Sequence, residues 1–153
     1  MATRSTIAFE HADGTVSMVY CHWDGYLEHN GSILLKHWSD ADKLRQLMEQ
    51  GDLSSLGKEI GEVHPFDNPH PYGSSAWKEF KETYRDQCTF YGRDRGEEGV
   101  AARVYRDFAE YQASPSFEEY NYILRTDGVW RVAFGYFYGT LEQAFAETAS
   151  QDE

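Results

Sequence analysis

The segment Tyr20–Gly31 (YCHWDGYLEHNG) holds the densest group of chemically versatile side chains in the sequence. Its thiol and imidazoles are of the types that ligate metals or act as nucleophile and base. However, the spacing of His22, His29 and His37 matches neither zinc-finger pairs nor ligands one helical turn apart. On a strand, the adjacent Cys21 and His22 would point to opposite faces. We therefore expect no metal site and no catalytic residue in this segment.

A second group of charged residues lies in Gly92–Gly99, a glycine-framed stretch. Arg93 and Arg95 are separated by one residue, so their guanidinium groups can converge on a phosphate if the loop curves. The alternative is that both arginines pair with carboxylates and tie the two unusual loops together. The candidate carboxylates are Asp94, Glu97, Asp24 and Glu28.

If the two loops meet, they would form a nucleotide pocket. Aromatic rings could stack on a base, the arginines could hold its phosphate, and a carboxylate or an amide could read its polar edges. The candidate ligand-binding residues are Trp23, Asp24, Tyr26, Asn30, Arg93 and Arg95. A different interpretation of Trp23 is that it fixes the loop to the core. We predict that the segment around Asp24 contacts the segment around Arg93.

Two hairpins are expected to position these loops. Residues 3–10 and 16–20 alternate in hydrophobicity around a turn at residues 12–14, and the first loop follows directly. Residues 117–125 and 129–138 flank the turn Thr126-Asp127-Gly128 in the same way. Further strands are predicted at residues 88–91 and 100–105.

Helices are predicted between the strands. One spans Ser32–Trp38, and a second opens at Ser39 as N-cap and ends at Gly51. The last begins with a capping box of Thr140 and Gln143.

A third helix is predicted from Ser75 to Arg85, after an irregular loop at residues 58–73 that is either a lid or a weakly ordered excursion. Trp77, Phe80 and Tyr84 fall on one face of this helix, and the spacing favours contact with the core.

These elements predict one α+β domain over residues 1–146, with an antiparallel sheet of about five or six strands built from hairpins and about four helices. The acidic residues 147–153 are expected to form a frayed tail.

Charge and composition narrow the function. Fourteen Lys and Arg against 26 Asp and Glu give a formal net charge of -12, and aromatic residues make up 16%, with 11 Tyr. Such a charge repels phosphate backbones, so we expect no direct binding of nucleic acid. The carboxylates either keep the protein soluble or imitate a nucleic acid for a basic groove. With Cys21 and Cys88 as the only cysteines and no apolar run that could span a bilayer, we expect a cytoplasmic protein without membrane contact.

Four stretches carry a resemblance to a family: the start MATRSTIA, the segment Tyr20–Gly31, GDLSSLG at residues 51–57 and YGRDRGE at residues 91–97. Together they resemble small proteins encoded by tailed phages and prophages. The resemblance covers about the first two thirds of the chain and brings no assigned activity and no catalytic residues. It implies a small accessory protein that acts on host machinery, including antagonism of host defence.

Two function hypotheses follow. The first is a non-enzymatic phage protein that blocks or sequesters a host protein, such as a nucleic-acid-processing or defence factor, in the host cytoplasm through its acidic, tyrosine-rich surface. The second is a protein that binds a nucleotide or nucleotide signal as a sponge, or processes it, with the six residues named above. We expect no cofactor. A structural or assembly role and a homo-oligomer stay open.

Overall fold

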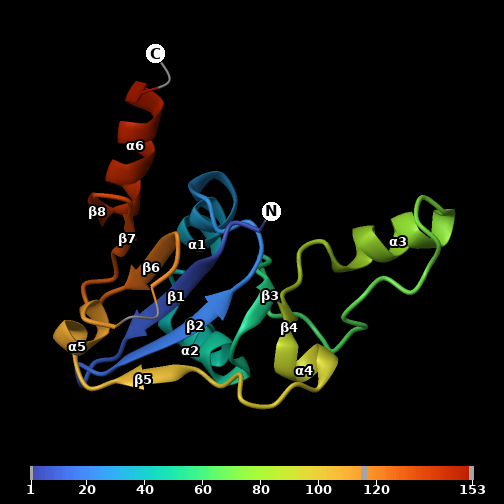
Figure 1. Ribbon diagram of the computed structural model, residues 1–153, viewed down its shortest axis with the longest axis horizontal. Helices are drawn as coiled ribbons and strands as arrows, with labels where there is room; N and C mark the ends of the chain where they lie inside the picture. Colours follow the sequence, from blue (N-terminus) through green and yellow to red (C-terminus); the bar gives the residue numbers. More distant parts are fainter. Residues whose placement is uncertain (1, 115–116, 152–153) are drawn as a thin grey trace.

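The computed structural model describes residues 2–114 and 117–151 as an α+β fold around one sheet (Figure 1). Within these residues the sheet has eight strands in the order β4-β3-β2-β1-β6-β7-β8, and β5 pairs with β2 outside this path. The strands are β1 (Ser5–Glu10), β2 (Val16–Cys21), β3 (Leu53–Ser55), β4 (Thr89–Phe90), β5 (Arg103–Tyr105), β6 (Tyr120–Leu124), β7 (Trp130–Phe134) and β8 (Phe137–Thr140). The helices are a π-helical turn η1 (Leu27–Gly31), α1 (Ser32–His37), α2 (Ala41–Gln50), α3 (Ser75–Tyr84), α4 (Tyr91–Arg95), α5 (Phe108–Gln112) and α6 (Leu141–Gln151).

The sheet is mixed, so the expected purely antiparallel sheet is wrong, although the α+β class is confirmed. β1 runs parallel to β6, and β2 runs parallel to β3 through the pair Cys21 and Leu53. The chain passes through α1 and α2 between β2 and β3, which is the long crossover that a parallel pair requires. The strand count was also too low, because β3 is only three residues long and a turn divides residues 130–140 into β7 and β8. The described residues hold six α-helices rather than the expected four.

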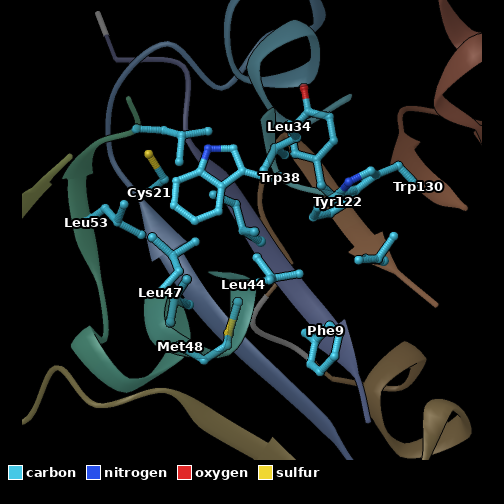
Figure 2. Close-up of a cluster of buried hydrophobic side chains, with 14 of the residues drawn as sticks. Phe9, Cys21, Leu34, Trp38, Leu44, Leu47, Met48, Leu53, Tyr122 and Trp130 are labelled. Carbon is cyan, nitrogen blue, oxygen red and sulfur yellow. The ribbon is translucent and has the colours of Figure 1, made fainter. Parts of the chain in front are cut away.

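The main core lies on the sheet face that α1 and α2 cover, and Leu141 and Ala144 at the start of α6 join it (Figure 2). Trp38 is fully buried there, and its indole N–H donates to the carbonyl oxygen of Gly57 at 2.9 Å. The hydroxyl of buried Tyr122 donates to the carbonyl oxygen of Gly25 at 2.6 Å. These two bonds satisfy the polar ends of large core rings and fix the loops that follow β2 and β3.

A smaller core lies on the opposite face under α5, where Tyr111 packs against Met18 and Ile123. At its edge, the guanidinium of Arg125 donates to both carboxylate oxygens of Glu10 at 3.1 and 3.0 Å, which joins the ends of the parallel strands β1 and β6.

Capping explains where several helices begin and end. The side chain of Asp40 accepts from two N–H groups at the start of α2, so the N-cap is Asp40 and the predicted Ser39 is wrong by one residue. Gly51 ends this helix at φ 82°, which is a conformation that glycine adopts without strain. The capping box of Thr140 and Gln143 is confirmed, with N–H to side-chain oxygen distances of 2.9 and 3.1 Å.

Residues 58–86, which we name the arm, extend away from the sheet and end in α3 (Figure 1). Ser74 caps α3, but no residue of the helix is buried. The prediction that Trp77, Phe80 and Tyr84 contact the core is therefore wrong.

At the other end of the chain, α6 continues through Gln151. Residues 152 and 153 of the expected frayed tail lie outside the described residues, and fraying stays a prediction. Every helix described is too short or too polar to cross a bilayer.

Candidate functional site

A cleft of about 590 Å³ opens between the arm and the sheet. Its walls come from four parts of the chain: the arm loop, α3, the neighbouring strands β3 and β4, and the segment after β2 that includes η1. This volume falls in the range of sites for small organic ligands. The cleft is therefore the candidate functional site.

The inner face of α3 supplies one wall. Phe80 packs edge-on against Tyr84 with ring centroids 4.9 Å apart, and the exposed Tyr72 covers part of Trp77 at 4.7 Å. The ammonium of Lys81 lies 4.7 Å from the centre of the Trp77 ring. Lys81 forms no ion pair with any described residue, whereas its neighbour Arg85 pairs with two carboxylates of its own segment. This wall offers aromatic faces next to an unpaired cation.

His64 attaches the arm to the sheet at the base of the cleft. Its ring stacks on Tyr84 at 4.6 Å, and its backbone N–H donates to the carboxylate of Asp94 at 3.2 Å. The two ring nitrogens face the carbonyl oxygens of Pro65 and Cys88 at 2.9 and 3.1 Å. Because both nitrogens already face protein atoms, the role of His64 is to position α3 over the cleft.

Asp24 lies on the opposite wall in an unusual backbone conformation. Its φ is 57°, and it is the only described residue other than glycine with a positive φ. This conformation costs roughly 1 kcal/mol, and asparagine and aspartate tolerate it best. The backbone N–H of Asn30 donates to the Asp24 carbonyl oxygen at 3.2 Å and holds the turn. The pKa of Tyr26 is raised above its ordinary value. The largest cause is the negative charge of Asp24, followed by burial and by a hydrogen bond to Asp24.

His29 stands beside Asp24 in this wall, and Asn30 orients it. Asn30 is fully buried, and its amide nitrogen is shared among three acceptors, of which the Trp23 carbonyl oxygen lies at 3.4 Å. The amide oxygen therefore faces His29 Nδ1 at 2.9 Å. An amide oxygen only accepts, so Nδ1 carries a proton, and in the tautomer with its proton on Nδ1 the other nitrogen, Nε2, is an acceptor. Nε2 has no hydrogen-bond partner among the described residues. This wall is thus rich in acceptors.

The structure separates the six predicted site residues into two groups. Asp24 lines the cleft and Asn30 supports it from behind, whereas Trp23 and Tyr26 are exposed by 46% and 36% and lie beside the cleft. Trp23 packs edge-on against His22 at 4.7 Å, so it does not anchor the loop in the core.

Arg93 and Arg95 brace the arm and lie outside the cleft lining. The Arg93 guanidinium donates to the Asp94 carboxylate at 2.9 and 3.1 Å and to three backbone carbonyl oxygens, two of them in the arm at Ile60 and Gly61. Arg95 pairs with Glu97 at 3.3 Å and lies over the Phe66 ring of the arm. Pairing with Asp94 and Glu97 was one of the two expected alternatives.

The predicted contact between the loops around Asp24 and Arg93 is wrong. β2 and β3 run parallel and β4 runs antiparallel to β3, so the loop after β2 and the helix α4 after β4 lie toward opposite ends of β3. No hydrogen bond, ion pair or ring contact joins the two segments in the part of the chain that the structure describes. Asp24 instead lines the same cleft as residues of the arm.

Thiol and metal chemistry have little support in this site. Cys21 and Cys88 are both fully buried, and desolvation raises the pKa of each thiol to about 12. A thiol of that pKa is not a nucleophile near neutral pH. Within residues 2–114 and 117–151, no group of three or more His, Cys, Asp or Glu could hold a metal ion.

Sequence reasoning missed the residues of the arm wall. Their helical spacing was recognised, but spacing does not reveal what covers an amphipathic face. A usable signal was the position of this helix after a long loop rich in Pro, Gly and His, with no hydrophobic segment adjoining it. Comparison of the chain with protein-family models, curated proteins and solved structures found no match.

Proposed function

We propose that the protein is a binding protein that sequesters a ligand in the cleft between the arm and the sheet. The observation that carries this proposal is the face of α3. Trp77, Phe80 and Tyr84 form an aromatic stripe on a helix without a buried residue, and the stripe lines a cleft of about 590 Å³. A ligand that enters the cleft would cover this apolar surface, which otherwise contacts water.

Binding fits the polar groups of the cleft better than catalysis. His64 faces backbone carbonyl oxygens with both ring nitrogens, and the thiols lie in the core. Asp24 and Lys81 are opposite charges that line the cleft, and neither forms an ion pair with a described residue, which suits the orientation of a ligand with complementary ends. The resemblance to phage accessory proteins supports a host-derived ligand.

The blocking of a host protein remains a second candidate function, because Tyr72 and Val63 of the arm are exposed by 88% and 68%. A partner that clasps the arm would bury both side chains. We expect a Tyr72→Ser variant to lose such a partner in affinity capture from host lysate. Equal capture by both proteins would contradict this function.

The cleft can be tested with anilinonaphthalene sulfonate, an aromatic anion that fluoresces in apolar surroundings. We expect saturable binding of one probe per chain. Ser55→Trp, which fills the cleft from β3, should abolish binding, whereas Gln46→Trp on the exposed side of α2 should not. Phe80→Ala should also weaken binding. Because this variant removes a ring without adding bulk, it tests the cleft even if Ser55→Trp disturbs the sheet. Equal probe binding by all four proteins would refute the cleft as the site.

A further inference from the structure

We infer that the cleft takes a mononucleotide whose base carries an exocyclic amine, such as AMP. This inference rests on the proposed function and names its ligand. It follows from the chemistry of the two walls: aromatic faces with a cation on the arm side, and hydrogen-bond acceptors on the sheet side.

The arm wall fits a base and a phosphate. Trp77 and Phe80 present aromatic rings of the kind on which nucleobases stack, and Tyr84, stacked on His64, extends this aromatic wall. Lys81 lies one helical turn after Trp77, and its ammonium is held near that ring without a carboxylate partner among the described residues. An unpaired ammonium next to a stacking surface is suited to a phosphate, to which it would donate charge-assisted hydrogen bonds. The formal net charge of -12 disfavours anions elsewhere on the protein, so binding depends on this local cation.

The sheet wall fits an amine. The Asp24 carboxylate accepts hydrogen bonds only, and the Asn30 amide fixes the tautomer of His29 that accepts at Nε2. Two acceptors in one wall favour a group with two N–H donors, which an exocyclic amine provides. A base that offers a carbonyl oxygen at this place would face the carboxylate without a proton between them. The wall therefore selects against such bases.

Matched ligands separate the two walls. AMP and adenosine differ only in the phosphate, and AMP and purine riboside monophosphate differ only in the amine. We expect AMP to displace anilinonaphthalene sulfonate and to raise the melting temperature, with adenosine and purine riboside monophosphate each about tenfold weaker.

Matched variants then assign each preference. Lys81→Gln should remove the preference for AMP over adenosine, whereas Lys78→Gln, on the same helix but outside the cleft lining, should retain it. Asp24→Asn should remove the preference for AMP over purine riboside monophosphate while the fold is kept, because asparagine tolerates a positive φ.

The results distinguish this inference from the proposed function. AMP is tested at about 1 mM, a concentration that detects even weak binding. If the probe binds in the cleft and AMP fails to displace it, the inference of a nucleotide ligand is wrong and the proposed binding cleft stands. If AMP displaces the probe but neither Lys81→Gln nor Asp24→Asn changes a preference, the assignment of the two walls is wrong. If Ser55→Trp leaves probe binding intact, both fail.

Discussion

Replacing Arg93 with glutamine should lower the free energy of unfolding by about 3 kcal/mol. Arg93 is 10% exposed in its side chain and Asp94 is fully buried. The guanidinium donates twice to this carboxylate and three times to backbone carbonyl oxygens at 3.0 to 3.1 Å. Removing one partner of a buried ion pair costs roughly 3–5 kcal/mol. The lower end applies because two backbone N–H groups still donate to Asp94.

Urea denaturation of Arg93→Gln and Arg95→Gln provides the measurement and its control. Arg95 is 52% exposed and its partner Glu97 40%, so its loss should cost at most about 1 kcal/mol. For a domain of this size we expect Arg93→Gln to lower the melting temperature by roughly 6–12 °C. A cost below about 1 kcal/mol, or one equal to that of Arg95→Gln, would refute the bracing role and reopen Arg93 as an anion ligand.

The cost should also depend on pH. Burial opposes the charge of Asp94, but hydrogen bonds from Arg93 and from two backbone N–H groups outweigh it and lower the pKa of this carboxyl. A lowered pKa in the folded protein contributes stability above the ordinary carboxyl pKa of about 4, and this contribution is lost as pH falls through the folded value. The difference between wild type and Arg93→Gln should therefore be largest near neutral pH and narrow in acid. A constant difference would contradict the ion pair as its source.

Three further predictions concern the core and its edges. Glu10→Gln should lower the free energy of unfolding by about 2 kcal/mol near neutral pH and by little in acid, because the hydrogen bond from Arg125 lowers the pKa of Glu10. Urea denaturation at two pH values measures this difference. Cys21 and Cys88 should react with a disulfide reagent only after unfolding, because both are fully buried and burial raises their pKa to about 12; prompt labelling of the native protein would contradict this. Gly51→Ala should destabilise by more than Gly73→Ala in urea, because both have φ near 80° but only at Gly51 would the new methyl lie 2.3 Å from a backbone carbonyl oxygen.

Local patterns predicted local structure. Both hairpins were recognisable because alternating hydrophobicity and a short turn specify an antiparallel pair without reference to the rest of the chain. The box of Thr140 and Gln143 was equally local. The parallel pairings of β1 with β6 and β2 with β3 were not, because they join segments far apart in sequence and depend on how the helices pack.

In the candidate site too, local features could be predicted from the sequence and long-range ones could not. Asp24 and Asn30 could be proposed from their residue types, because both lie in one short turn that is held by local hydrogen bonds. The facing wall was not, because Lys81 reaches the cleft only through the path of the arm. Strand direction alone decided which segment faces Asp24, and a two-residue strand such as β4 leaves almost no trace in hydrophobic alternation.

The position of the arm explains why the aromatic residues of α3 have the spacing of a core helix and yet line a cleft. An amphipathic helix in the core would bury Trp77, Phe80 and Tyr84, which is how its periodicity was interpreted. In the fold, Arg93 and His64 attach the base of the arm to the segment around β4 and α4, and the aromatic face of α3 lines a cleft. Hydrogen bonds donated from both sides fix the base of the arm, so the cleft is formed before a ligand enters and stays available to it. The bracing arginine and the binding cleft are therefore linked: a variant that loosens Arg93 should weaken probe binding even though Arg93 does not line the cleft.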